Sequence, residues 1–351
     1  MTTVIATLFV LGILIFVHEL GHFVVAKWVG IRVERFSLGF PPKMIGRTIG
    51  GTEYCISWVP LGGYVKMAGE VPDEQQVTGA PDEFMSKTPT QRAAVIIAGP
   101  LMNLLTAFVL CWAMFYVQGE PVIDPEHVIV GTVIPRGPAE RAGIKPGDVI
   151  VDVDGVAVMQ FAEMARLVHN RPGDSLLITW SRDGRMFSGW MTALDTTMLD
   201  SSGQKARQGL IGIGEGFKTI PHGFLRAGIL GAQRTLALAG EVLSFLWKVI
   251  TLQVSFKMIA GPVFIAKLAG EAAQQGFSSL LRLVLFLSVN LAIVNVLPIP
   301  VLDGGHLLFL ATEQLRGRPL SLKQRSIAQQ IGLFFILIFI SFVTYNDFFR
   351  R

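Results

Sequence analysis

Three residues that can act together on a metal ion lie inside an apolar segment near the N-terminus. Residues 16–23 read FVHELGHF, so His18, Glu19 and His22 interrupt a run of hydrophobic side chains. On a helix, positions i and i+4 share one face, so both imidazoles can bind a single Zn²⁺ ion. Glu19 lies beside them and can take a proton from attacking water. The H-E-x-x-H pattern therefore predicts a zinc hydrolase site with Glu19 as general base.

A zinc hydrolase needs a third protein ligand and an open fourth position. The best candidate is Asp303, within the stretch NVLPIPVLDGGH at residues 295–306, because the neighbouring Pro and Gly residues end a helix there. His306, in the same stretch, is the alternative third ligand. The remaining histidines lie in a more polar region and are interpreted as ordinary surface residues: His127, His169 and His222.

The composition indicates an integral membrane protein with a soluble part. The 351 residues are 51% hydrophobic and only 16% charged, whereas soluble domains carry roughly 25% charged residues. The mean hydropathy is +0.52. The net charge of +4 is small and gives no reason to expect a nucleic-acid partner. The two cysteines, Cys55 and Cys111, lie far apart, which excludes a disulfide framework.

Four stretches carry few or no charges and are long enough to cross a bilayer, which takes about 20 residues. They are residues 4–26, 93–117, 283–302 and 326–346. The first lacks the basic region and cleavage site of a signal peptide, so we expect it to be retained.

Lys and Arg residues gather between the first and second spans and between the third and fourth, so these loops are predicted to be cytoplasmic. Both termini and the region between the second and third spans are then expected on the outer side. Residues 222–252 are also apolar, but their charged side chains recur every seven or eight positions and form one stripe. This pattern favours an interfacial helix over a fifth span.

Residues 31–66 have the pattern of a membrane-associated β-hairpin on the cytoplasmic side. Gly50-Gly51 can turn the chain between two β-like stretches. In the second stretch Tyr54, Ile56 and Trp58 alternate with the residues between them. We predict that these three residues align an unwound substrate by strand pairing.

Residues 124–216 have the composition of a small soluble α+β domain. The stretch GPAERAGIKPGDVIVDVDG at 137–155 predicts a short helix over 139–142, a turn and a strand over 149–153, and it resembles the PDZ domain. In a circularly permuted PDZ domain the peptide-docking strand comes last, and GLIGIG at 209–214 matches it. The predicted docking residues are Leu210, Ile211, Gly212 and Ile213. A size filter for substrates is the expected role of this domain.

HELGH in the first span, together with NxxPxPxLDGG in a late span, resembles the site-2 protease family of intramembrane zinc metalloproteases. The resemblance extends over GGYVKMAGE (62–70), AGPLMN (98–103), GPVFIAK (261–267) and LDGGHLLFL (302–310), and is strongest for the bacterial RseP-like branch that regulates the envelope-stress sigma factor. It implies zinc ligands at His18, His22 and Asp303, and substrate-holding roles for Asn290 and Asn295. That branch carries two PDZ domains in tandem, whereas this chain has room for one.

The sequence thus predicts an α-helical membrane protein with four transmembrane helices, a membrane-associated β-hairpin and an inserted α+β PDZ-like domain. The expected segments are 1–30 (first span), 31–91 (hairpin and loop), 92–118 (second span), 124–216 (PDZ-like domain), 222–275 (interfacial helix and connection), 280–305 (third span), and 306–351 (cytoplasmic loop and fourth span).

The expected function is zinc-dependent cleavage of single-span membrane proteins, such as an anti-sigma factor or a remnant signal peptide, after their outer portion has been trimmed. The expected location is the bacterial inner membrane, in contact with lipid. Two alternatives remain. One is a metal transporter or sensor in which His18, His22 and Asp303 form a transit site. The other is an inactive membrane scaffold that carries a PDZ-like domain.

Overall fold

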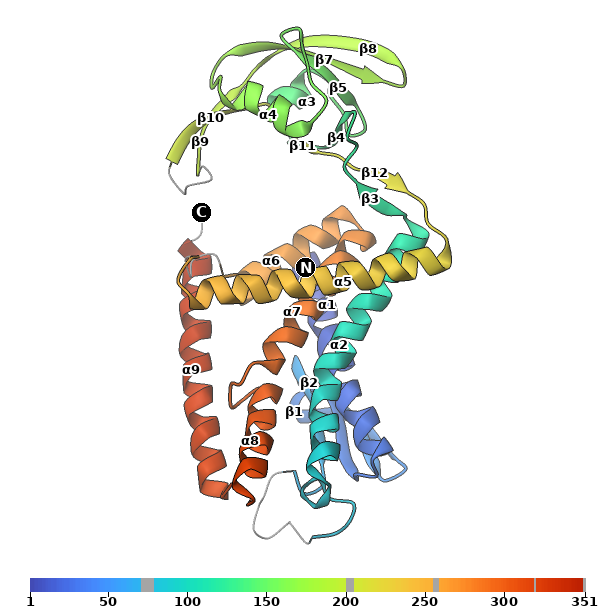
Figure 1. The fold of residues 1–351 in the computed structure, drawn as a ribbon, viewed down its shortest axis with the longest axis vertical. Coiled ribbons are helices and arrows are strands. Elements are labelled where there is room, and N and C mark those ends of the chain that lie inside the picture. Colours follow the sequence, from blue (N-terminus) through green and yellow to red (C-terminus); the bar gives the residue numbers. More distant parts are fainter. Residues whose placement is uncertain (71–78, 200–204, 255–258, 319, 350–351) are drawn as a thin grey trace. The chain divides into compact units, whose positions relative to one another are not determined.

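The computed structural model describes residues 1–70, 79–199, 205–254, 259–318 and 320–349, and the chain divides into two compact units. The first unit comprises Met1–Ala113 and Leu225–Arg351, and the second comprises Met114–Phe224. Helices make up most of the first unit and strands most of the second (Figure 1). The long helices of the first unit are α1 (Thr2–Trp28), α2 (Pro89–Val117), α5 (Phe224–Ile250), α7 (Phe277–Val296) and α9 (Leu322–Phe349). Its shorter helices are η1 (Phe84–Ser86), α6 (Pro262–Gln275) and α8 (Asp303–Arg316).

Among the described residues, five helices are long and apolar enough to cross a membrane: α1, α2, α5, α7 and α9. Four of them coincide with the predicted spans, and α5 covers the segment that we expected at the interface. Figure 1 shows α5 running across the direction of α2 and α9. Gly231 allows this crossing, because a Cβ there would lie 2.9 Å from the backbone nitrogen of Trp112 in α2. The predicted total of four crossing helices is therefore not confirmed by length and composition, which admit α5 as a fifth.

Helix α1 packs through one stripe of side chains spaced about four residues apart, as a helical period requires. Its N-terminal half contacts α6 and α7 in an apolar cluster. The buried members of this cluster are Ala6, Val10, Leu14, Ala269, Leu280 and Val284. The C-terminal half of α1 buries His18, Gly21 and His22 instead. The same stripe that holds the helix in place thus carries the predicted ligands.

The predicted hairpin is present as β1 (Val33–Ile49) and β2 (Thr52–Met67). Gly50 and Gly51 both have positive φ, +57° and +79°, as a tight two-residue hairpin turn requires.

The hairpin folds back on itself, because residues 33–40 face two different parts of β2. Phe36, for example, is opposite both Val65 and Tyr54. Residues 53–56 pair with residues 35–38 and also with residues 45–48, and therefore lie inside the sheet. Residues 63–67 form an edge, because no other strand in the described part of the chain pairs with their far side.

The helical conformation is interrupted between α7 and α8, where Pro298 and Pro300 were predicted to end a helix. Helix α7 ends at Val296, and α8 begins at Asp303. Residues 306–316 were expected in a cytoplasmic loop, but they belong to α8. The helix resumes because the two prolines interrupt the hydrogen-bond ladder only between α7 and Asp303.

The second unit is built on a sheet whose strand order is β11-β4-β5-β7-β8, with β6 paired to β5. The second unit also contains two separate two-stranded sheets, one formed by β9 and β10 and the other by β3 and β12. The strands are β3 (Glu120–Val122), β4 (Val128–Val133), β5 (Val149–Val153), β6 (Val156–Ala157), β7 (Ser175–Arg182), β8 (Arg185–Thr192), β9 (Leu194–Leu199), β10 (Lys205–Leu210), β11 (Ile213–Glu215) and β12 (Lys218–Ile220). The helices are α3 (Pro138–Arg141) and α4 (Phe161–His169). The predicted strand over 149–153 is confirmed as β5, and the predicted short helix is α3, one residue earlier than expected.

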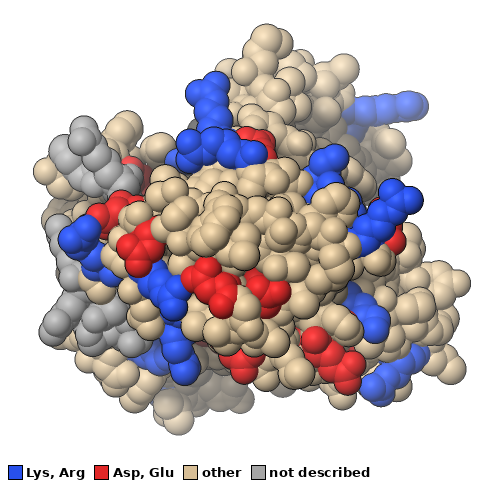
Figure 2. Space-filling view, turned by 90° about the horizontal axis from the view of Figure 1, so that it is seen from above, with Lys and Arg blue, Asp and Glu red and all other residues tan. Residues whose placement is uncertain are grey.

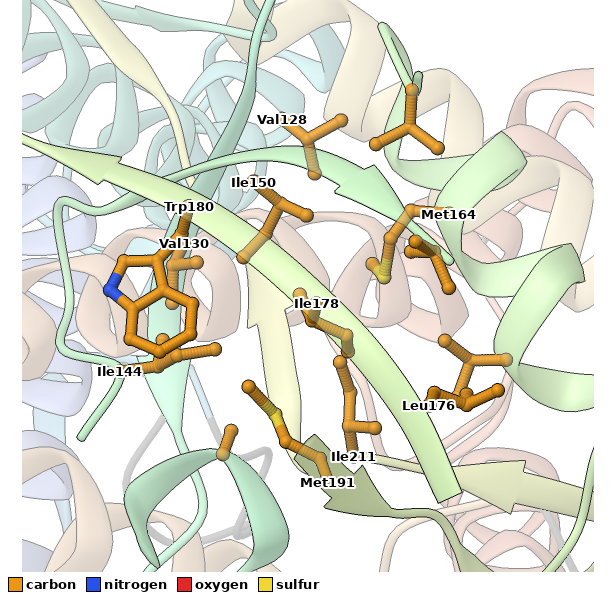
Figure 3. Packing of buried hydrophobic residues seen from close by; sticks show 14 of the residues in the cluster. Val128, Val130, Ile144, Ile150, Met164, Leu176, Ile178, Trp180, Met191 and Ile211 are labelled. Atoms are coloured by element: carbon orange, nitrogen blue, oxygen red, sulfur yellow. The ribbon is translucent and has the colours of Figure 1, made fainter. Parts of the chain in front are cut away.

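An apolar core holds the second unit together (Figure 3). Ile150 and Ile178, from the neighbouring strands β5 and β7, point into it, and Met164 of α4 packs on them. All three side chains are almost completely buried, and burying one such side chain stabilises the fold by roughly 1.5–3 kcal/mol. On the face of the molecule seen in Figure 2, the described basic and acidic side chains are interspersed and form no large patch of one sign.

Candidate metal and catalytic site

His18, His22 and Asp303 come together in the first unit, although 281 positions separate His22 from Asp303. One ligand atom from each lies within 4.8 Å of the others. His18 Nε2 is 3.1 Å from Asp303 Oδ2, and His22 Nε2 is 3.5 Å from Asp303 Oδ1. The two Nε2 atoms are themselves 3.1 Å apart. His306 lines the same cavity but is not in this group.

The surroundings of His22 leave its Nε2 free to bind a metal. Its Nδ1 lies 2.8 Å from the carbonyl oxygen of Val95, which can only accept a hydrogen bond, so Nδ1 carries the proton. The lone pair is then on Nε2, which faces the cavity. This arrangement, in which one ring nitrogen is fixed by a hydrogen bond, is typical of metal-binding histidines.

Asn103 plays the same part for His18. Its amide lies 3.2 Å from His18 Nδ1, and its Oδ1 is buried without a hydrogen-bond partner. The two ends of an amide are assigned from their neighbours, and turning this one over lets Oδ1 accept the Nδ1 proton. His18 Nε2 then also presents a lone pair.

Three electron-pair donors therefore converge, because neither Nε2 atom has a proton to give to the Asp303 carboxylate. Asp303 Oδ2 is buried with no hydrogen-bond partner. Such a carboxylate is costly in an apolar interior unless a cation neutralises it. A His₂Asp donor set fits Zn²⁺ and leaves a fourth position for water or substrate.

Small residues allow the helices that carry the ligands to approach closely. A Cβ at Gly21 would lie 2.2 Å from the carbonyl oxygen of Ala98, so only glycine permits this contact between α1 and α2. A Cβ at Gly99 would lie 2.4 Å from His22 Nε2 and 2.8 Å from His18 Cε1. Gly99 therefore makes room for both imidazoles.

Two further glycines fix Asp303 at the start of α8. A Cβ at Gly304 would lie 2.2 Å from the carbonyl oxygens of Val296 and Leu297, and one at Gly305 would lie 2.3 Å from that of Ile299. The helix thus begins pressed against the end of α7. The two glycines after Asp303 therefore help to position its carboxylate in the site.

Glu19 and the edge of the hairpin share a cavity of about 700 Å³ with the ligands. The backbone N–H of Val65 is within hydrogen-bonding reach of the Glu19 carboxylate. A Cβ at Gly63 would lie 3.4 Å from Glu19 Cγ, so this part of β2 lies directly against α1. The base, the donor cluster and a free strand edge therefore border one cavity.

Of the two asparagines that the family resemblance implied, the structure brings one to the site. Asn295 Nδ2 lies 3.3 Å from His18 Nε2 and borders the cavity. Asn290 donates a hydrogen bond to the carbonyl oxygen of Phe286, 2.8 Å away, and is not among the residues that border the cavity.

Tyr54, Ile56 and Trp58 do not line the cavity either. Tyr54 and Ile56 belong to the stretch of β2 that pairs on both sides and lies inside the hairpin sheet. The part of the hairpin that does line it contributes Tyr64, Val65 and Met67. The alternation of side chains in the sequence indicated strands, but it did not indicate which strand forms the edge.

The predicted docking residues of the second unit lie where β10 ends and β11 begins. Leu210 ends β10, and Ile211 is buried in the core. Gly212 has φ +82°, which lets the chain turn into β11, where Ile213 pairs with Val133. β11 is an edge strand of the sheet. An edge is the geometry that strand docking requires.

Sequence reasoning missed Asn103 and Glu70. Asn103 ends the stretch AGPLMN, where a polar residue inside an apolar span was the available signal. Glu70 borders the cavity, and burial raises its pKa to about 7. A single Glu after a β-like stretch gives no sequence signal that distinguishes it from a surface residue.

Comparison with known proteins identifies a family and relatives that match nearly the whole chain. Residues 6–339 match the family model described as Peptidase family M50. A candidate zinc metalloprotease of Rhizobium meliloti is 36% identical over 361 residues, which cover 98% of this chain and 96% of the relative. The zinc metalloprotease RasP of Bacillus licheniformis is 30% identical over 424 residues, which cover 99% of both.

Among solved structures, the PDZ domain of an SdrC-like protein from Listeria innocua matches with 26% identity and a TM-score of 0.21. The match covers 26% of this chain and 93% of that domain.

Proposed function

The chain belongs to peptidase family M50, and we propose that it is an intramembrane zinc endopeptidase that cuts single-span membrane proteins. The observation that carries the proposal is the cavity that brings Glu19 beside His18, His22 and Asp303. This cavity belongs to the unit that holds the long apolar helices α1, α2, α7 and α9. A transport site would not need a carboxylate next to the ligands, whereas peptide hydrolysis needs a base there.

The residues divide the chemistry between them. Zinc, when held by His18, His22 and Asp303, supplies a Lewis acid that makes water acidic enough to react near neutral pH. Glu19 accepts the proton of the attacking water and later returns it to the leaving amine. Asn295, beside His18, donates its amide hydrogens to the substrate backbone.

The edge of the hairpin at residues 63–67 aligns the substrate. A helix inside a membrane has its backbone groups bonded internally and must unwind before water can attack. The outward N–H of Val65 lies beside Glu19, and an unwound segment that adds to this edge brings a peptide bond to the base. This assignment replaces Tyr54–Trp58 as the pairing segment.

The arrangement in the membrane follows from charge and helix type. We place α1, α2, α7 and α9 across the bacterial inner membrane and α5 in its outer interface, in contact with lipid. Both termini and the second unit then face outward. We assign the second unit the role of a size filter that admits substrates, such as an anti-sigma factor or a remnant signal peptide, whose outer portion has already been trimmed.

Glu19→Gln tests the proposal. The amide keeps the shape of the side chain but does not accept the proton, so cleavage of a single-span substrate by the purified protein should fall by about 100-fold or more. Zinc content per mole should stay at the wild-type level. Glu34→Gln is the matched control, because Glu34 pairs with Lys66 on the same hairpin and does not border the cavity. Substantial cleavage by the Glu19 variant would exclude Glu19 as the base, and an inactive wild-type protein with bound zinc would favour the transport reading.

A further inference from the structure

The edge at residues 63–67 presents two outward N–H groups, and a carboxylate lies against each. The N–H of Val65 is within reach of Glu19, and the N–H of Met67 donates to Glu70 Oε2 at 3.2 Å. The register of β1 against β2 shifts between Val33 and Arg35, opposite this stretch. Just past the end of β2, the N–H of Ala68 points the other way from that of Met67 and donates to the carbonyl oxygen of Arg32 at 2.9 Å. Successive residues of a strand alternate in this way.

Glu70 engages both backbone groups of Met67 that face outward. Its carboxylate accepts the Met67 N–H, and its own N–H donates to the Met67 carbonyl oxygen at 3.4 Å. Gly69, with φ +67°, lets the chain turn back for this purpose. A strand that paired at Met67 would make the same two bonds. Glu70 thus occupies the place that a partner strand would take.

The place is part of the substrate path. Glu70 borders the same cavity as Glu19 and the donor cluster. Val65 and Met67 are successive outward positions, and two residues of a strand span about 6.8 Å. The position that Glu70 fills is therefore the next pairing position along the edge from the catalytic base.

We propose that Glu70 holds the pairing position at Met67 until a substrate strand displaces it, and that it thereby limits how far an unwound substrate extends along the edge. The inference rests on the proposed function. It makes Glu70 a residue that tunes substrate binding without acting on the scissile bond. A substrate that pairs at Met67 must break both hydrogen bonds, and substitution of the Glu70 side chain removes only the one that its carboxylate accepts.

Three substitutions separate the hydrogen bond of Glu70 from its charge. Glu70→Gln keeps an oxygen that accepts the Met67 N–H but removes the charge. Glu70→Asp keeps the charge but shortens the side chain by roughly 1.5 Å, one carbon–carbon bond, so it withdraws from Met67. Glu70→Ala loses both. Glu34→Ala is the control, because it removes a carboxylate from the same hairpin away from the cavity.

The measurements are KM and kcat for a single-span substrate in detergent, and zinc content for every variant. KM should fall about 3- to 10-fold for Glu70→Asp and Glu70→Ala, the range that one net hydrogen bond supplies. KM for Glu70→Gln and Glu34→Ala should stay at the wild-type value, and kcat and zinc content should not change in any variant. Distortion of the turn at Gly69 and Glu70 would not lower KM, so a lower KM distinguishes loss of competition from structural damage.

Several results would overturn the inference. An unchanged or higher KM in Glu70→Asp would show that Glu70 does not compete with substrate. An equal fall in Glu70→Gln would assign the effect to charge, and zinc loss in any Glu70 variant would assign the residue to the metal site. If Glu70→Ala does not fold, Glu70→Asp decides alone. A wild-type protein that cuts no substrate refutes the proposed function instead, so the two failures are distinguishable.

Discussion

Gly99→Ala should empty the metal site without disturbing the helix that carries the substitution. A Cβ at Gly99 would lie 2.4 Å from His22 Nε2, 2.5 Å from His22 Cε1 and 2.8 Å from His18 Cε1. The three nearest atoms thus belong to the two imidazole ligands. Alanine is also a better helix former than glycine, by about 1 kcal/mol, so α2 itself should not be weakened.

The size of the effect follows from the overlap. Ordinary contact begins near 3.4 Å, so the imidazole of His22 must withdraw by about 1.0 Å to admit the methyl group. Metal–ligand distances tolerate only about 0.2 Å. The withdrawal is several times that tolerance, and the hydrogen bond from His22 Nδ1 to Val95 resists rotation of the ring. Zinc affinity should fall at least about 100-fold, the upper end of what disturbed ligand orientation costs.

The assay is zinc per mole of purified protein, followed by competition with a chelator of known affinity. Gly12→Ala is the control, because it also replaces a glycine in an apolar helix and its Cβ meets nothing within 4 Å. It should keep wild-type zinc and activity. A Gly99→Ala protein that elutes as a folded monodisperse species and binds zinc with wild-type affinity would refute the geometry on which the site is built.

Two further predictions concern the third ligand and the second unit. Asp303→Asn should lower zinc content because an anionic ligand is lost, while His306→Ala should retain zinc; metal analysis of both variants checks this, and the reverse result would exchange their roles. Deletion of residues 127–214 with a short Gly/Ser bridge should permit cleavage of an untrimmed single-span substrate, whereas Ile213→Asp in the intact domain should not. Loss of activity on a trimmed substrate in both variants would instead indicate peptide-gated activation.

The parts of the site that the sequence predicted are those whose geometry is local. His18 and His22 share a helix face because they are four residues apart. Gly50-Gly51 makes a hairpin turn because glycine alone tolerates positive φ at both positions without cost. Asp303 stood out because prolines precede it and glycines follow it. In each case the residue and its nearest neighbours in the chain sufficed.

The parts that escaped depend on which segments meet in space. The pairing of residues 33–40 with both halves of β2 decides that Tyr64–Met67 forms an edge and that residues 53–56 lie inside the sheet. Alternating side chains assign the two faces of a strand but not its neighbours. Asn103 was missed for the same reason. From sequence alone, a polar residue in a membrane span can either form a contact between helices or hydrogen-bond to a metal ligand. The two roles are distinguished only when the residue that it contacts is known.

The contacts of the buried polar side chains of α1 explain why an apolar helix can contain them. His18, Glu19 and His22 would be costly in an apolar helix if they stood alone. Val95 and Asn103 of α2 fix the two imidazoles, Asp303 of α8 adds the anionic donor, and the N–H of Val65 on the edge of β2 lies within reach of Glu19. Glycines allow several of these approaches: Gly21 lets α1 contact α2, Gly99 makes room for the imidazoles, and Gly304 and Gly305 let α8 begin against the end of α7. Gly21, Gly99, Gly304 and Gly305 are therefore as much a condition of the chemistry as the ligands, and this is why substitution at Gly99 is the sharpest test of the site.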